Sequence, residues 1–169
     1  AQEAFLENLE EWPARRKNAY LKMHYAPYWL NVPLDRQLAH ARLIGAGKDG
    51  DDTMRTEVTT DRFQEITELT IYAPDHPRLL SALTGACAVA GANIADAQFF
   101  TTSTGMSLNM IFIQREFDRS EDEERRADRI VDTMRKALGG KIRLPDAIAR
   151  QAKPRPRIKA FSVEPQVHI

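Results

Sequence analysis

The residues best suited to chemistry lie where an alternating apolar segment breaks at Pro74-Asp75-His76-Pro77 and becomes apolar at helical spacing. Asp75 and His76 stand side by side there, and Arg78 follows. An aspartate beside a histidine suggests an acid–base pair. The start of a helix also presents unpaired backbone N–H groups with a partial positive charge, which favour a bound carboxylate. A plain helix cap explains Asp75 and Pro77 equally well at this stage.

The surrounding sequence argues against catalysis in this chain. Adjacent residues at a helix start point in different directions, and Cys87 lies about three turns further along the predicted helix, on its buried side. The four histidines (24, 40, 76 and 168) lack metal-ligand spacing, and the strand-to-helix turn lacks the glycines of a phosphate loop. We therefore assign no catalytic residue and no metal site to the chain.

Composition excludes several other classes. The chain has 169 residues, with 24 basic and 24 acidic side chains and no net charge, so no bulk charge favours nucleic acid or an anionic membrane. The segment Met106–Ile113 lacks an RNA-binding signature. No apolar run approaches the roughly 20 residues of a membrane span. A single cysteine fits a reducing compartment, so we expect a cytoplasmic location, in a piece of a longer protein.

Residues 1–45 are predicted to form a helical connector. An apolar stripe starts at Phe5, a second helix begins after Pro13 and runs to about His24, and a third ends at Gly45. Its aromatic residues are expected to pack together or against a neighbour; a base-stacking surface is the alternative, but no basic stripe accompanies it. Residues 46–60 are predicted to be a linker with an extra strand at Arg55–Thr60. They lack the ligand pattern of a calcium loop.

Residues 61–169 are predicted to be one α+β domain. Strands are expected at Leu69–Ala73, Asn93–Thr102, Met106–Gln114 and Ile158–Val163. The first helix carries an inner stripe of Leu79, Leu80, Leu83, Cys87 and Ala90; the second opens with a capping box, Ser120 to Glu123, and buries Ala127, Ile130, Val131, Met134 and Leu138. An irregular insertion, about 141–157, with a short helix at Pro145–Gln151, precedes the last strand.

This β-α-β-β-α-β order predicts a ferredoxin-like sandwich, an antiparallel sheet with both helices on one face. The other face is expected to be covered by a second copy or another domain, and would carry Thr70, Tyr72, Asp96, Gln98, Phe100, Asn109 and Ile111. The helix-start turn is expected to lie beside the start of the second strand. The predicted ligand site therefore comprises Asp75, His76, Pro77, Arg78 and Leu79, with Asn93, Ile94 and Asp96 opposite.

The segment ELTIYAPDHPRLLSALTGACAVAGANIADAQFFTTSTGMSLNMIFIQ resembles an ACT domain, an amino-acid-sensing module with this strand and helix order. Asp75-His76-Pro77-Arg78-Leu79-Leu80 stands where the family has Asp-Arg-Pro-Gly-Leu-Leu. Arg78 replaces the usual glycine, and either fills the pocket, binds a carboxylate through its paired N–H groups, or faces solvent.

The flanking segments YWLNVPLDRQLAHARLI, IFIQREF and KIRLP extend the likeness to the family of enzymes that uridylylate the PII nitrogen-signalling protein and reverse that modification. The resemblance implies a parent enzyme that uses UTP and a divalent metal, Mg²⁺, whose catalytic motifs are missing from this chain. It also implies that this part senses an amino acid, glutamine, and pairs with a second ACT domain or another copy. The alternative is an ACT-fold interaction module that binds no small ligand.

Overall fold

The computed structural model describes residues 2–46 and 54–151. Four helices come first: α1 (Gln2–Glu7), α2 (Ala14–Met23), α3 (Ala26–Asn31) and α4 (Leu34–Gly45). Strands β1 (Arg55–Asp61) and β2 (Ile66–Pro74) lead to α5 (Leu79–Val89), then to β3 (Ile94–Thr101) and β4 (Met106–Gln114). Helices α6 (Ser120–Leu138) and α7 (Leu144–Gln151) follow. The predicted strand at 158–163 lies outside the described residues.

The four strands form one antiparallel sheet in the order β1-β2-β4-β3, which confirms the α+β class. Because β2 and β3 each run antiparallel to β4, they run in the same direction on its two sides. Strand β1 pairs with β2 over seven residues, from Arg55 opposite Tyr72 to Asp61 opposite Ile66. The predicted extra strand is thus an integral edge strand, and it occupies the free edge of β2.

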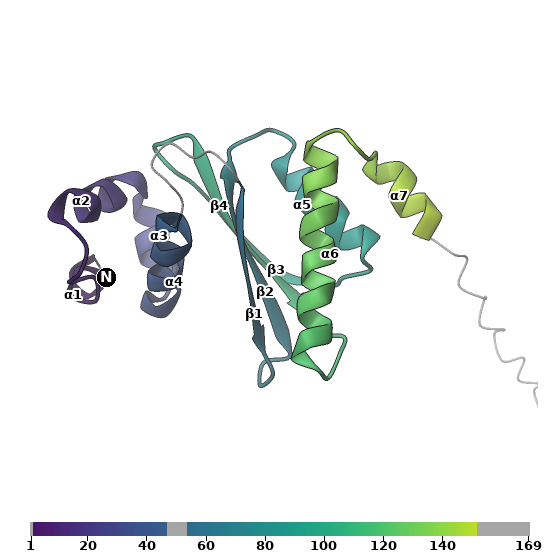
Figure 1. Cartoon of the computed structure of the whole chain (residues 1–169), viewed down its shortest axis with the longest axis horizontal. Coiled ribbons are helices and arrows are strands. Elements are labelled where there is room, and N and C mark those ends of the chain that lie inside the picture. Colours follow the sequence, from purple (N-terminus) through teal and green to yellow (C-terminus); the bar gives the residue numbers. More distant parts are fainter. Residues whose placement is uncertain (1, 47–53, 152–169) are drawn as a thin grey trace, which may run out of the picture.

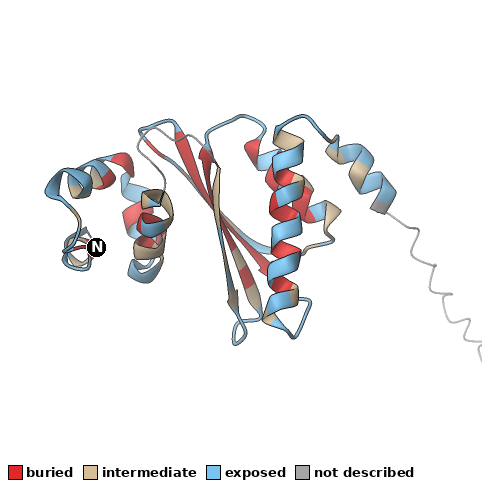
Figure 2. Ribbon diagram, viewed as in Figure 1, coloured by how far each residue is buried: buried red, intermediate tan, exposed pale blue. Residues whose placement is uncertain are grey.

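Helices α5 and α6 cover one face of the sheet, as predicted (Figure 1). Their inner sides pack on the odd-numbered side chains of β2 and on Ile111 and Ile113 of β4. Buried residues follow the facing sides of these layers in Figure 2. The predicted stripe of α6 lies in this core. Leu80 differs from the prediction and is 52% exposed, because the buried side of α5 passes through Leu79 and Leu83.

The N-terminal helices cover the opposite face of the sheet, which the sequence analysis had left for a partner (Figure 1). A second core forms there between aromatic residues of the helices and Tyr72, Leu108, Met110 and Phe112 of the sheet. Phe100 joins it through a ring contact with Tyr28 at 5.5 Å. The chain therefore supplies its own cover for part of this face.

Two residues were placed on the wrong face by the sequence analysis. Ile111 packs in the core under α5 and α6, and Asn109 pairs directly with Ile71, whose side chain lies in that same core. The reason is that Met106 to Ile113 are all buried, so β4 shows no alternation from which its register can be read.

Proline begins or precedes three of the N-terminal helices. Pro13 and Pro33 stand at the cap positions of α2 and α4, and Pro27 lies in the first turn of α3. Within residues 2–46 and 54–151, no helix combines the length and apolarity needed to cross a membrane.

Candidate functional site

The predicted site begins in the turn between β2 and α5. Asp75 N–H donates to the Gly105 carbonyl at 3.0 Å, which fastens this turn to the β3–β4 turn. The ring Nδ1 of His76 accepts from the Arg78 N–H at 3.0 Å, and its carbonyl accepts from Leu79 N–H at 2.8 Å. His76 therefore holds the turn before α5, but Arg78 is the N-cap residue of the helix and no side chain caps it, so the helix cap predicted at Asp75 or His76 is wrong.

The five predicted residues of the turn differ in accessibility. Asp75, His76, Pro77 and Arg78 are exposed, whereas Leu79 is 4% exposed and lies in the core. The Arg78 carbonyl accepts hydrogen bonds from Ala82 N–H and Ser81 Oγ, both at 2.9 Å. The turn can thus offer a ligand the side chains of residues 75–78, but not that of Leu79.

The other half of the predicted site lies at the start of β3. The Asn93 amide donates to Gln114 Oε1 at 2.6 Å, and the Asn93 carbonyl accepts from Gln114 N–H. Asp96 accepts from the Ala97 N–H at a register shift between Ile94 and Asp96. The two contacts of Asn93 attach the start of β3 to the end of β4.

The prediction that the two halves face each other within one copy is wrong. Pro74 pairs with Met106 at one end of β4, whereas Ile94 pairs with Ile113 near the other end. Seven residue steps of about 3.3 Å put roughly 23 Å between these two levels of the sheet. The physical reason is the parallel direction of β2 and β3, since the carboxyl end of one strand then lies opposite to the amino end of the other.

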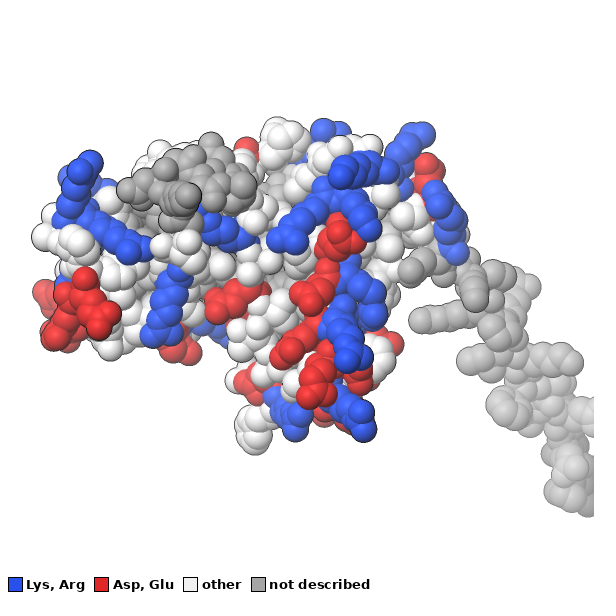
Figure 3. Space-filling model, viewed as in Figure 1, with Lys and Arg blue, Asp and Glu red and all other residues white. Residues whose placement is uncertain are grey.

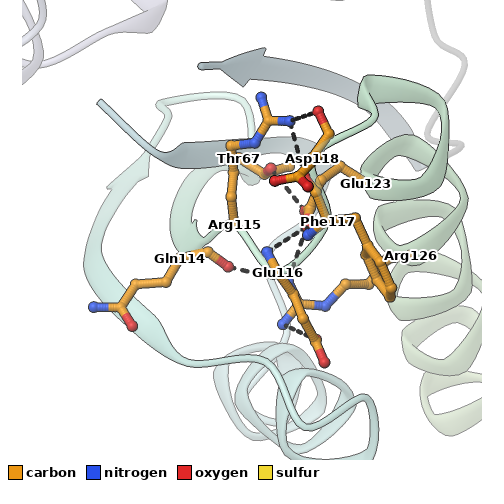
Figure 4. A network of polar contacts seen from close by, with 8 residues as sticks. All are labelled: Thr67, Gln114, Arg115, Glu116, Phe117, Asp118, Glu123 and Arg126. Atoms are coloured by element: carbon orange, nitrogen blue, oxygen red, sulfur yellow. Dashed lines mark hydrogen bonds and ion pairs between the residues drawn. The ribbon is translucent and has the colours of Figure 1, made fainter. Parts of the chain in front are cut away.

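A buried polar network lies near the start of β3, and the sequence analysis did not find it (Figure 4). Glu123, fully buried on α6, accepts from the N–H groups of Glu116 and Phe117 and from Thr67 Oγ1. Arg126 approaches the same carboxylate at 3.5 Å and donates to the Gln114 carbonyl at 3.0 Å. The carboxylate thus ties α6, β2 and the β4–α6 loop together.

The predicted capping box is consequently wrong. Arg119, not Ser120, is the N-cap residue of α6, and no side chain caps it. Ser120 Oγ instead accepts from Arg62 Nε at 3.2 Å. Burial by itself raises the pKa of Glu123, but hydrogen bonds from the Glu116 and Phe117 amides, from Thr67 and the nearby Arg126 outweigh it, so that the pKa lies below its usual value.

A cleft lies between α4 and the outer face of β1 and β2, with a volume of about 240 Å³. Its polar lining includes Arg36 and Glu68, which form an ion pair at 3.0 Å. The remaining lining residues are Asp35, Ala39, His40, Glu57, Thr59, Asp61, Gln64, Ile66 and Thr70. Glu57, Thr59 and Asp61 alternate along the chain, and this pattern indicates a polar face on β1. The sequence does not indicate that α4 packs over that face.

Burial shifts the titration of groups in and behind the cleft. Burial raises the pKa of Glu68, although Arg36 opposes the shift. Burial, with the nearby Arg36, lowers the pKa of His40 to about 4, so His40 is neutral at pH 7. Its Nδ1 lies 3.1 Å from the Tyr28 hydroxyl, which connects the cleft to the aromatic core.

The remaining candidates for chemistry are unremarkable in reactivity. Burial raises the pKa of the Cys87 thiol to about 11, so the thiol stays protonated at neutral pH. Among the described residues, no group of three or more His, Cys, Asp or Glu side chains is arranged to hold a metal ion. The outer face of α6 mixes acidic and basic side chains rather than presenting one sign of charge (Figure 3).

Comparison with known proteins identifies relatives of the chain. No protein-family model matches it. Its 169 residues are 49% identical to part of the bifunctional uridylyltransferase/uridylyl-removing enzyme of Bradyrhizobium sp. strain BTAi1, and 48% identical to part of the same-named enzyme of strain ORS 278. The chain is related to a segment of these enzymes.

The match covers this chain from end to end but only 18% of the length of each bifunctional uridylyltransferase/uridylyl-removing enzyme. The chain is thus consistent with a fragment of such an enzyme. The likeness to the uridylylating family that the sequence analysis drew from short segments is confirmed at the level of the whole chain.

Proposed function

We propose that this chain is a non-catalytic regulatory module of a bifunctional uridylyltransferase/uridylyl-removing enzyme, and that it senses an amino acid, glutamine. The observation that carries the proposal is the 49% identity with a segment of that enzyme over the entire chain. The succession β2-α5-β3-β4-α6 and the Asp75 to Leu80 turn support the ACT-like role.

In this proposal the parent enzyme carries out the uridylyl transfer and removal on the PII protein in the cytoplasm, using UTP and Mg²⁺ in domains outside this chain. The division into a connector (1–45), a linker with a strand (46–60) and an ACT domain (61–169) remains part of the proposal. Regulation needs only about 1–3 kcal/mol of differential binding between two states of the enzyme.

The turn at Asp75 to Arg78 remains one proposed contact surface for the effector. Because the start of β3 lies at the other end of the sheet, a site that uses both segments must combine two copies or two ACT domains. Self-association or pairing with a second ACT domain is therefore part of this version of the sensing proposal.

Calorimetric titration of the chain with glutamine, up to about 10 mM, tests the sensing role. Glutamine has about ten non-hydrogen atoms, and at roughly 0.4 kcal/mol each the expected binding free energy is about −4 kcal/mol, near the millimolar range. Saturable heat is the expected result. A folded chain that gives no heat would contradict glutamine sensing.

The second candidate is an interaction module that binds no small ligand. Phe99 on the edge strand β3 is 42% exposed and Leu80 on α5 is 52% exposed, so apolar groups remain available for pairing. Light scattering over a concentration series, with and without glutamine, tests this alternative. Self-association with no response to glutamine favours the interaction module over the sensor.

A further inference from the structure

We propose that the cleft between α4 and β1–β2 is an α-amino-acid-binding site complete within one copy of the chain. In this arrangement Arg36 binds the carboxylate of the ligand, and the acidic side chains around it hold the ammonium group. The site is separate from the β2–α5 turn. The proposal rests on the proposed function only in that the sensed molecule is an amino acid.

Arg36 is positioned to receive a carboxylate. Its Nε donates to Glu68 Oε2 at 3.0 Å, and its guanidinium lies over the Phe112 ring, 4.9 Å from the ring centre. These two contacts fix the plane of the group, while its Nη atoms make no hydrogen bond with the residues described by the structure. A guanidinium held in this way retains the paired donors that match a carboxylate.

The charge around Arg36 favours an ammonium group. Four carboxylates line the cleft, from Asp35, Glu57, Asp61 and Glu68, against one guanidinium. Figure 3 shows acidic side chains between α4 and the sheet. A simple carboxylic acid would be repelled by this surplus of negative charge, whereas a zwitterion presents a cation to the carboxylates and an anion to Arg36.

Glu68 supplies the buried polar part of the site. Its side chain is only 13% exposed, and Thr70 Oγ1 contacts its other oxygen at 3.4 Å. Glu68 therefore has a fixed position on the floor of the cleft, and Asp35 and Glu57 lie at its exposed margin. Glu68 thus orients Arg36, while the exposed carboxylates of Asp35 and Glu57 remain accessible to the ligand.

The size of the cleft restricts the ligand. Drug-sized ligands occupy pockets of roughly 300–1,000 Å³, and the cleft measures about 240 Å³. A single amino acid is of the appropriate size.

Binding at this position would connect two parts of the chain. Asp35 and Arg36 belong to α4, whereas Glu57 and Glu68 belong to the sheet. A ligand held by both sides favours the arrangement in which α4 lies over β1 and β2. The cleft thus offers a route by which an amino acid could alter how the helical segment sits on the sheet.

Calorimetry with glutamine, arginine and putrescine tests the site. Arg36→Lys keeps a cation beside Glu68 but removes the paired donors, and Thr59→Arg introduces a large cation on the exposed strand position that lines the cleft. Both are expected to weaken amino-acid binding at least tenfold. The matched controls Arg42→Lys, on the same helix, and Thr101→Arg, on an exposed position of β3, should bind as the unchanged chain does.

Putrescine has ammonium groups but no carboxylate and is expected to bind at least tenfold more weakly than the amino acids. Equal binding of putrescine would overturn the assigned role of Arg36. Unchanged amino-acid binding by Arg36→Lys and Thr59→Arg would overturn the site itself.

Asp75→Ala separates this inference from the turn site. Loss of glutamine binding in Asp75→Ala, with binding intact in Arg36→Lys, would refute the cleft and leave glutamine sensing standing. Arginine binding that requires Arg36, without any glutamine binding, would support the cleft and refute glutamine as the effector. No heat with any amino acid would contradict both.

Discussion

Replacing Glu123 with alanine should produce a large loss of stability. The substitution removes the acceptor of two backbone N–H groups and of Thr67 Oγ1, and it leaves Arg126, which is 3% exposed, with only the exposed carboxylate of Glu116 at 3.2 Å. Breaking a buried ion pair by removing one partner typically costs about 3–5 kcal/mol. Glu123 is fully buried and accepts hydrogen bonds from the backbone of the β4–α6 loop, so its removal falls in this range. We expect the free energy of unfolding to fall by about 4 kcal/mol.

Urea denaturation at pH 7, followed by circular dichroism, measures this loss. At about 2–4 °C per kcal/mol for a chain of this size, the melting temperature should also fall by roughly 8–16 °C. The matched control is Glu124→Ala, the neighbouring exposed residue on the same helix, which should change stability by no more than about 0.5 kcal/mol. Equal effects of the two substitutions would refute the structural role assigned to Glu123.

Three further predictions concern other parts of the chain. Burial, with His40 nearby, lowers the pKa of His24 to about 3, so the stability that neutral His24 contributes is present above pH 6.5 and is lost as the pH falls. At pH 5 this loss is roughly 2 kcal/mol. Denaturation curves of His24→Phe across pH should lack this part of the pH dependence. Glu65 has a positive φ of 54°, so Glu65→Gly should raise the free energy of unfolding by about 0.5–1 kcal/mol in urea, and a decrease would contradict the strain. A Cβ at Gly85 would lie 2.6 Å from Leu144 Cδ1, so Gly85→Leu should displace α7 from α5. Trypsin should then cleave within α7 faster than in the unchanged chain. An unchanged cleavage rate would show that α7 accommodates the larger side chain without leaving its position.

Local sequence patterns predicted the positions of the central strands and helices to within a few residues. The strand predicted at Met106–Gln114 has those same bounds, and α5 and α6 follow stripes that the sequence shows at helical spacing. The short helix predicted at Pro145–Gln151 corresponds to α7. Helix α3 was missed because its six residues are too few to show a helical period.

The long-range arrangement was harder to predict from the sequence. Whether α4 covers β1 depends on contacts between residues about 30 positions apart, such as Arg36 with Glu68, and no local pattern encodes them. The same holds for Glu123, which reads as a capping residue in sequence but bonds across the β4–α6 loop. The error about the two halves of the ligand site came from strand direction, since β2 and β3 are parallel and the segments lie at opposite ends.

The central claim is that this chain binds an amino acid. Backbone amide NMR spectra, recorded while glutamine is added to about 10 mM, test it most directly because they report both binding and location. We predict saturable shifts among residues 35–40 of α4 and 57–68 of β1 and β2. Spectra of the folded chain that stay unchanged throughout the titration would contradict the account.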